Sequence, residues 1–470
     1  MPAGSFLGSL ISSPIANKWS RKYAIQLAGI IWIIGALIQC FAQNVGMLVA
    51  GRVIAGICVG MTSALVPVYQ SEIAPKEIRG RIVSLQQWAI TWGILIQYFI
   101  QYGCSFVDGG ITNPNQSTKA FRIPWGIQAV PGAILVIGLI WFPKSPRWLA
   151  SKDRWEECLS VLADIHGHGD PNHPRVLAEY TEIKEAIRFE REDQATSITQ
   201  ILKPRILKRV GLGMMIQMWS QLCGMNVMMY YIVYVMQGAG IDDPLLSAAI
   251  QYVINVVMTI PAIIWVDKWG RRPTLLLGSF GMMTWLFISG SLQGVYGEPN
   301  PVKDGAVTWV LIGKKNEAKA IIACSYLFVA SFAISWGPVS WTYPAEIFPL
   351  RVRALAVSIA TCTNWAWNCA LAFAVPPLLR SINWKMYLIF GAFNGCALIN
   401  MFLMAHETKG RTLEEMDSVF DSGLPPWKTG GIESKLDTLA KQIEQGEIKV
   451  KLDESEKGNS TEHIDHMGKQ

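Results

Sequence analysis

Long apolar stretches recur along the chain and are separated by short polar segments. They lie at 2–16, 24–43, 48–70, 84–103, 125–143, 207–237, 246–266, 273–296, 317–344, 351–379 and 384–405. A helix needs about 20 apolar residues to cross the hydrocarbon core of a bilayer. Because lipid offers backbone groups no hydrogen-bond partner, each stretch is predicted to be a helix. The pattern predicts an all-α membrane protein with eleven spans.

Two charged motifs occur twice and in the same order. The motif Glu72-Ile-Ala-Pro75-Lys-Glu-Ile-Arg79 returns as Glu346-Ile-Phe-Pro349-Leu-Arg-Val-Arg353. Each copy follows a short basic motif, Asn-Lys-Trp-Ser-Arg-Lys at 17–22 (the first basic motif) and Asp-Lys-Trp-Gly-Arg-Arg at 267–272 (the second). Repeats of this kind indicate two related halves of a transporter. We predict an N-terminal half at 1–143, a linker with short helices at 144–206, a C-terminal half at 207–405 and a tail at 406–470.

Eleven spans are an unexpected number for a duplicated bundle. The chain opens directly on Met1-Pro2, and the first apolar stretch has only about 15 residues, which is marginal for a crossing. We therefore expect that the first of twelve helices is missing. A genuine eleven-span protein is the alternative.

Lysine and arginine gather in the short loops on one side of the predicted bundle, around both basic motifs and their partner motifs. The positive-inside rule makes this side cytoplasmic, which places the linker and the C-terminal tail in the cytoplasm. The net charge of +6 comes mostly from these cytoplasmic loops. It therefore does not indicate a nucleic-acid partner. We expect a multi-pass protein of the plasma membrane, with the lipid bilayer as its main surroundings.

Charged residues at the ends of predicted helices are candidates for a cytoplasmic gate. Glu72 and Glu346 lie within reach of the basic motifs, and Arg79 and Arg353 follow about two turns later. Such groups can form ion pairs in one conformation that break in another. The alternative is that they only anchor the helices at the membrane surface.

Several longer motifs resemble the sugar porter family of the major facilitator superfamily, over essentially the whole chain. They lie at 67–81, 143–149, 221–226, 337–341, 364–368 and 406–415, and among relatives the chain looks most like fungal high-affinity, proton-coupled hexose transporters. The sequence departs from the family pattern at Asn17, Ser20, Lys144, Ser220 and His406. The resemblance implies a major facilitator bundle and extends the gate to Arg21, Glu72, Arg79, Arg147, Asp267, Arg271, Glu346, Arg353 and Glu407.

Amide side chains within the apolar stretches indicate a polar cavity, because amides are costly in lipid. Gln217 and Gln221 lie four residues apart, as do Asn364 and Asn368, so each pair shares one helix face. Amides both donate and accept hydrogen bonds, as sugar hydroxyls do. The resemblance implies hydroxyl ligands at Gln87, Gln217, Gln221, Asn226, Asn255 and Asn364, a stacking ring at Trp341, and Asn368 as a neighbour. Hydrogen bonding between helices is the alternative, and we prefer it for Gln97.

Proton coupling needs a buried carboxylate, and none lies in the interior of the predicted spans. Arg52 does lie within a span. A lone cation there is expensive, so it either reaches the surface or had a partner on the missing helix. The resemblance favours the partner and implies proton symport.

The predicted function is transport of a monosaccharide such as glucose by alternating access. A uniporter, a sugar sensor and an inactive truncated form are the alternatives, and a polyol, disaccharide or quinate-like substrate stays open. Nine single cysteines and six histidines in loops or tail suggest no metal site, no cofactor and no enzyme active site.

Overall fold

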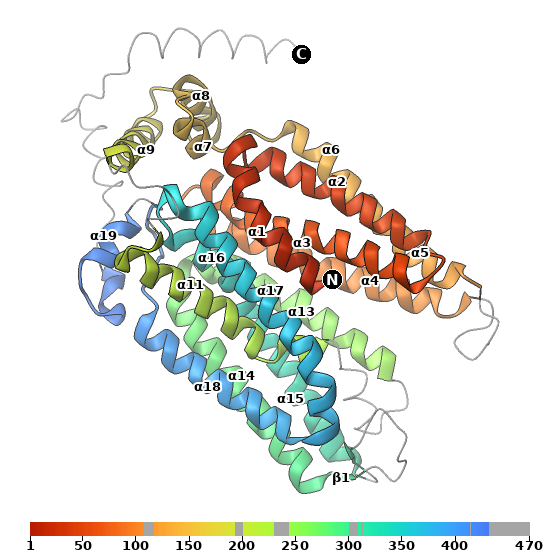
Figure 1. Cartoon of the computed structure of the whole chain (residues 1–470). Helices are drawn as coiled ribbons and strands as arrows, with labels where there is room; N and C mark the ends of the chain where they lie inside the picture. Colours follow the sequence, from red (N-terminus) through yellow and green to blue (C-terminus); the bar gives the residue numbers. More distant parts are fainter. Residues whose placement is uncertain are drawn as a thin grey trace.

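The computed structural model describes residues 1–107, 117–192, 201–229, 244–299, 309–311, 314–413 and 415–431. The predicted tail at 406–470 lies outside these residues from position 432 onward. The bundle consists of helices that run side by side in Figure 1, with the short helices α7, α8, α9 and α19 at one end. That end also carries both basic motifs, and we call it the basic face.

The helices follow the predicted stretches closely. Their bounds are α1 (Pro2–Trp19), α2 (Arg21–Cys40), α3 (Val45–Ile73), α4 (Arg79–Cys104), α5 (Lys119–Ile127), α6 (Ala129–Gly138), η2 (Leu139–Trp141), α7 (Pro146–Ser151), α8 (Trp155–His166), α9 (Pro174–Glu192), α11 (Pro204–Leu222), α13 (Pro244–Trp269), α14 (Arg271–Tyr296), α15 (Lys315–Ile334), α16 (Trp336–Ile347), α17 (Leu350–Ser381), α18 (Lys385–Met404), α19 (Met416–Asp421) and η3 (Pro426–Gly431). The strands β1 (Glu298–Pro299) and β2 (Trp309–Val310) form one antiparallel pair.

Seven helical stretches in the described part of the chain are long and apolar enough to cross a membrane: Arg21–Cys40, Val45–Ile73, Lys119–Trp141, Ala248–Trp269, Arg271–Tyr296, Lys315–Ile347 and Lys385–Met404. The remaining predicted spans fold as α1, α4, α11 and α17, but serines and amides lower their hydropathy. Many of these polar residues are buried inside the bundle. Eleven crossings therefore stay a prediction.

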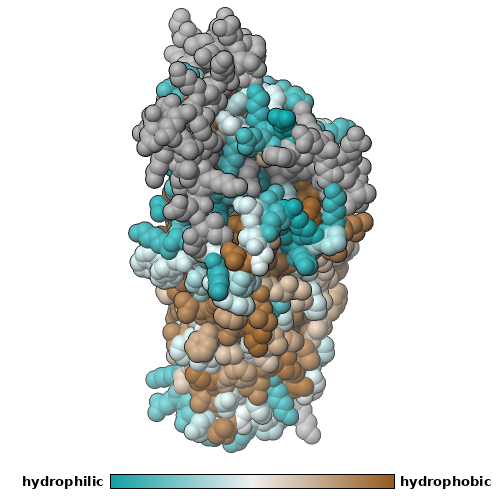
Figure 2. All heavy atoms as spheres, turned by 90° about the vertical axis from the view of Figure 1, so that its left-hand side faces the viewer, coloured by the Kyte–Doolittle hydropathy of each residue, from teal (hydrophilic) through white to brown (hydrophobic). Residues whose placement is uncertain are grey.

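The surface and the core divide as expected for a protein that lies in lipid. Figure 2 shows an apolar belt between two more hydrophilic ends. The largest buried apolar cluster joins α11 and α13–α18 around Trp336, Met282 and Phe328. A separate cluster around Leu159 and Ile183 holds α7, α8 and α9 together, so the predicted short linker helices have a small core of their own.

The helices α1 and α3 pack unusually closely through glycines. A Cβ atom added to Gly8 would lie 2.0 Å from the Ile57 carbonyl oxygen, and one added to Gly60 would lie 1.9 Å from the Ser5 carbonyl oxygen. Small residues permit such backbone approach between membrane helices. This contact fixes α1 against the N-terminal half, and α1 also packs on α17 of the C-terminal half.

Candidate functional site

The amide pairs of α11 and α17 meet inside the bundle. Asn364 Nδ2 donates to Gln217 Oε1 at 2.6 Å, and Gln221 Nε2 donates to Asn364 Oδ1 at 3.1 Å. Asn368 Nδ2 donates to Gln221 Oε1 at 3.0 Å. All four side chains are buried. Because the two residues of each pair lie one helical turn apart, the four side chains form a continuous row of hydrogen bonds. We call these four residues the amide cluster.

Asn226 joins this cluster through a break in the helix. Helix α11 ends at Leu222, and Gly224 then takes a φ of +94°, which glycine adopts without steric cost. The chain becomes helical again at Met225, and Asn226 in this segment donates from its Nδ2 to Gln221 Oε1. Gln217 in turn donates to the Ser340 carbonyl of α16 at 2.9 Å. The cluster is therefore held by three segments of the C-terminal half.

The remaining predicted ligands are Gln87, Trp341 and Asn255, and the hydrogen bonds found within the described residues include none from them to the amide cluster. Gln87 on α4 is buried against α16, where a Cβ atom added to Gly337 would lie 3.4 Å from Gln87 Nε2. Trp341 follows Gly337 by four residues and is half-buried. Asn255 is buried on α13. Gln97, in contrast, donates to the Pro124 carbonyl at 3.3 Å, in agreement with a role in helix packing.

Unused hydrogen-bonding capacity remains beside these amides. Asn368 Oδ1 and Asn255 Oδ1 are buried and accept no hydrogen bond from any described residue. A buried acceptor without a donor costs about 1–3 kcal/mol. A ligand with several hydroxyl groups can supply donors to these oxygens and can also exchange with the amide–amide bonds. The arrangement is therefore suited to a neutral polyhydroxylated molecule.

The predicted gate residues of the N-terminal half gather around Glu72 at the basic face. Arg21 Nε lies 3.2 Å from Glu72 Oε2, and the Ser145 hydroxyl donates to the same oxygen at 2.5 Å. Arg147 donates to the Glu72 carbonyl at 2.8 Å and contacts Glu179 at 3.5 Å. The Glu72 carboxylate thus joins α2 and α3 to the start of α7, and Arg147 extends the group to α9.

His166 extends this group of charges. Its Nε2 lies 3.4 Å from Glu179 Oε2, with Arg147, Arg175 and Glu77 also acting on it. Burial lowers the pKa of His166, and the attraction of Glu179 opposes that change without reversing it. Burial likewise raises the pKa of the nearby Cys158 thiol to about 12, which leaves it protonated and unreactive at neutral pH.

The C-terminal half repeats the same arrangement around Glu346. Arg271 binds it with two hydrogen bonds, at 3.1 and 2.7 Å, and the Thr408 hydroxyl donates at 2.6 Å. Tyr69 and Tyr343, three residues before the respective glutamates, donate to the Pro143 and His406 carbonyls at 2.6 and 2.8 Å. Pro143 and His406 therefore occupy equivalent positions in the two halves. The residues that follow them, Lys144 and Glu407, are equivalent as well.

Contacts between the halves close the basic face. Asp267 accepts hydrogen bonds from the Gly80 N–H at 3.0 Å and the Arg81 N–H at 2.8 Å, at the start of α4. Arg353 lies 3.8 Å from Glu72, and Arg79 donates to the Arg411 carbonyl at 3.0 Å. The predicted gate residues are thus brought together, and they bridge the two halves.

Two further contacts between the halves were missing from the sequence-based prediction. The Ser12 and Ser358 hydroxyls hydrogen-bond at 2.7 Å, and Trp365 Nε1 donates to the Ser63 hydroxyl at 3.0 Å. The recurrent serines of α1 could have indicated a polar face. The partner of Ser12 on α17, however, lies 346 residues further along the chain. No local pattern connects such positions.

The predicted proton-coupling residue Arg52 lies away from the amide cluster. Its guanidinium carbon stacks 4.1 Å from the centre of the Trp125 ring, and its Nη1 lies 3.8 Å from the Met1 sulfur. The salt bridges found within the described residues include none to Arg52. Stacking on tryptophan offsets part of the cost of the cation.

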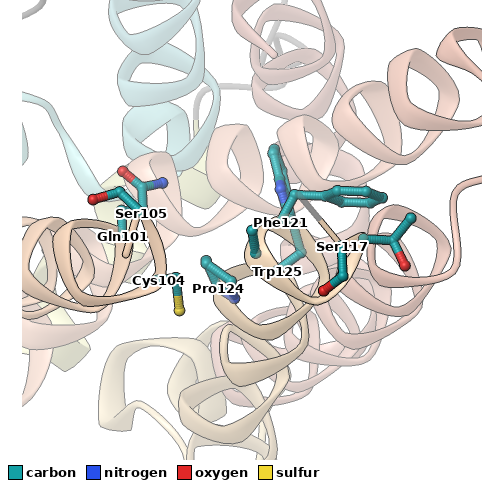
Figure 3. Close-up of a pocket in the computed structure, with 9 residues that line it drawn as sticks. Gln101, Cys104, Ser105, Ser117, Phe121, Pro124 and Trp125 are labelled. Atoms are coloured by element: carbon teal, nitrogen blue, oxygen red, sulfur yellow. The ribbon is translucent and has the colours of Figure 1, made fainter. Parts of the chain in front are cut away.

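A pocket of about 380 Å³ opens between the end of α4 and α5 (Figure 3). Because α4 starts at the basic face, the pocket lies at the opposite end of the bundle. Gln101 and Cys104 of α4 and the C-cap Ser105 line one side, and Phe121 and Trp125 of α5 lie on the other. It contains none of the predicted ligands. Because the amide cluster carries the hydrogen-bonding chemistry, we regard this pocket as separate from the binding site.

Comparisons with known proteins agree with the sequence motifs. A family model described as "Sugar (and other) transporter" matches residues 1–420. The chain is 62% identical to the protein named MFS glucose transporter mfs1 of Aspergillus flavus, over 99% of this chain and 88% of that protein. It is 44% identical to a high-affinity glucose transporter of Kluyveromyces lactis, over 91% and 78%. The solved proton:xylose symporter XylE of E. coli, bound to 6-bromo-6-deoxy-D-glucose, aligns with a TM-score of 0.76 and 27% identity, over 89% and 87%.

Proposed function

Because the chain belongs to the sugar porter family of the major facilitator superfamily, we propose that it carries a hexose such as glucose across the membrane by alternating access. The observation that supports this most directly is the amide cluster. Gln217, Gln221, Asn364 and Asn368 come together from two helices, and neighbouring amide oxygens are left without donors. Sugar hydroxyls supply both the donors and the acceptors that these amides need.

The proposed ligands are Gln87, Gln217, Gln221, Asn226, Asn255 and Asn364, with Trp341 as the ring that stacks on the sugar and Asn368 beside them. Stacking on an aromatic face covers the C–H side of a sugar ring. A few net hydrogen bonds of about 1 kcal/mol each give millimolar to micromolar affinity, or about −4 to −8 kcal/mol. A carrier benefits from this range because tighter binding slows release.

Alternating access requires a gate that opens and closes on each side of the binding site. We propose that the paired groups around Glu72 and Glu346 keep the basic face closed and separate when it opens. The bridges from Asp267 to α4 and from Arg353 to Glu72 support this role, since they join opposite halves. The halves can then rock about the amide cluster.

The proposed topology has eleven crossing helices, with α1, α4, α11 and α17 in addition to the seven more apolar ones. The basic face lies in the cytoplasm of a plasma-membrane protein, together with the linker at 144–206 and the tail at 406–470. The halves at 1–143 and 207–405 are the bodies that move. The concentration of lysine and arginine on this face supports the orientation.

Proton symport is proposed through Arg52, whose stacking on Trp125 keeps a cation near the opposite end of the bundle. Addition of sugar to de-energised cells should then make the medium more alkaline. Sugar uptake without alkalinisation would instead support a uniporter.

The test of the transport function is uptake of labelled glucose by cells that lack their own hexose carriers. Cells that express the chain should take up glucose in a saturable way, with competition by related hexoses. Expression at the cell surface without uptake would contradict transport and would favour a sensor or an inactive form.

A further inference from the structure

The two halves differ in charge at one pair of equivalent positions on the basic face. In the C-terminal half, the Glu407 carboxylate accepts hydrogen bonds from the Arg271 N–H at 2.9 Å and the Arg272 N–H at 3.2 Å. It thereby covers the start of α14. In the N-terminal half the equivalent residue is Lys144, so a cation takes the place of an anion beside the start of α2. The N-cap residue of α2 makes no side-chain capping hydrogen bond.

Ser20, the N-cap of α2, points toward the position of the absent carboxylate. Ser20 has φ 96° and ψ 158°, and its equivalent Gly270 has φ 91° and ψ 161°. A Cβ atom added to Gly270 would lie 2.5 Å from Glu407 Oε2, so the Ser20 side chain has the same direction. Ser20 is fully buried, and its hydroxyl oxygen has no hydrogen-bond partner within the described residues.

Positive charge is concentrated around this serine. Lys22 Nζ donates to the Ile140 carbonyl at 3.0 Å, and the charge of Lys144 acts on it. Lys144 contacts Glu157 at 3.8 Å, but Glu157 also pairs with Arg154. Glu157 thus pairs with two cations and Glu72 with Arg21, while Lys22 donates only to a carbonyl within the described residues, and the start of α2 adds the positive end of a helix dipole. The local charge calls for an additional anion.

The adjacent surface is apolar and uncovered. Trp141 is 75% exposed and Phe142 is 55% exposed, directly after the carbonyl that Lys22 binds. In the C-terminal half, Arg272 donates to the Phe402 carbonyl at 2.9 Å, and Trp427 stacks on the Phe402 ring at 5.7 Å. In the N-terminal half, Trp141 and Phe142 form an exposed apolar surface directly beside the carbonyl that binds Lys22.

We propose that the start of α2 is a binding site for an anionic phospholipid. The phosphate oxygens lie outside Ser20, between the Lys22 and Lys144 ammonium groups, and the acyl chains cover Trp141 and Phe142. A lipid fits better than a free anion because the cations and the exposed aromatic rings are contiguous, as at the interfacial belt of membrane proteins. The inference goes beyond transport and requires no sugar to be moved.

The test measures lipid binding to the purified full chain. Native mass spectrometry and thermal unfolding are followed while phosphatidylserine or phosphatidylcholine is titrated into the detergent. Phosphatidylserine should bind saturably and raise Tm, and phosphatidylcholine should do neither at the same concentrations. Lys144→Gln should weaken binding about five-fold, the contribution expected of one lysine near a membrane surface.

Two further variants sharpen the experiment. Ser20→Gly combined with Lys144→Glu recreates the glycine and carboxylate of the C-terminal half, and it should abolish phosphatidylserine binding while Tm in phosphatidylcholine is kept. Lys268→Gln removes an exposed lysine from the equivalent rim of the other half and should bind like the wild type. If the double variant Ser20→Gly with Lys144→Glu fails to fold, the single variant Lys144→Gln still tests the proposal. The Lys144 side chain is partly exposed, so its replacement is expected to be tolerated.

The proposal is overturned if phosphatidylcholine binds as well as phosphatidylserine, or if Lys268→Gln weakens binding as much as Lys144→Gln. It is also overturned if soluble glycerophosphoserine competes at the same concentration as the lipid, because the site would then bind a free anion. All these readouts are independent of glucose uptake, so failure here leaves the proposed transport function unaffected.

Discussion

At the scale of single residues, Gln221 shows why an amide suits this site. Its Nε2 donates to Asn364 while its Oε1 accepts from Asn226 and Asn368. One side chain therefore links two helices and the segment after Gly224. A sugar with several hydroxyl groups can bond both to Gln221 and to the amide that it displaces, which keeps the exchange nearly balanced in free energy.

Substitution of Gln221 tests this role. Gln221→Ala removes one donor and one acceptor worth about 1 kcal/mol each, so the apparent affinity for glucose should fall by about ten-fold or more. Equilibrium binding of labelled glucose to the purified protein measures the change. Gln97→Ala is the matched control, since Gln97 bonds to the Pro124 carbonyl instead, and an equal loss in both variants would refute the assignment.

Titration of His166 makes a second prediction at this scale. Burial holds its pKa in the folded protein below its ordinary value of 6.5, so the unfolded chain binds more protons in that range. Stability is then fully present above about pH 6.5 and falls as the pH decreases. Tm should decline from pH 7.5 to pH 5.5, and His166→Gln should flatten this decline. An unchanged slope in the variant would exclude His166 as its source.

At the scale of elements, close packing of α1 on α3 depends on residues without side chains. Gly8 and Gly60 let two backbones approach within distances that a Cβ atom would prevent. The loss of even one glycine forces the helices apart along their shared length. This contact also supports α17, which packs on the other side of α1.

Substitution of Gly8 by alanine should therefore be strongly destabilising. The added Cβ would lie 2.0 Å from the Ile57 carbonyl, and overpacking of this kind costs about 1–3 kcal/mol. Thermal unfolding in detergent should show a clear decrease in Tm. Gly93→Ala on α4 is the control, because no atom lies within 4 Å of its added Cβ. A similar Tm for both variants would contradict the packing argument.

The sequence predicted these elements better than their contacts. Apolar stretches located the helices, and the four-residue spacing of Gln217 with Gln221 and of Asn364 with Asn368 predicted faces that do meet. The bonds from Ser12 to Ser358 and from Ser63 to Trp365 could not be predicted, because they join helices distant in sequence. The charge difference between Lys144 and Glu407 was visible in the motifs, but its surroundings required the structure.

At the scale of the whole molecule, Asp267 is the contact that joins the halves most directly. Its carboxylate accepts two backbone hydrogen bonds at the start of α4 while it also pairs with Arg271 at 3.0 Å. The equivalent residue of the first basic motif is Asn17, which lacks the negative charge. We therefore expect the C-terminal motif to contribute more than the N-terminal one to holding the two halves together at the basic face.

This asymmetry predicts unequal effects of mutation. Asp267→Ala should open the basic face, and a spin-label pair across that face should show longer distances by double electron–electron resonance. Asn17→Ala should change the distances little. If both variants shift them equally, the two motifs contribute equally and the asymmetry is wrong.

The central claim is that the chain moves a neutral hexose across a membrane through the amide cluster. Counterflow in proteoliposomes tests it directly, because labelled glucose must exchange with unlabelled glucose inside whether or not protons are coupled. Vesicles with the wild-type protein should accumulate label transiently, with competition by glucose and not by quinate, and Gln221→Ala should need a glucose concentration about ten-fold higher for the same signal. Accumulation no greater than in protein-free vesicles would contradict the account.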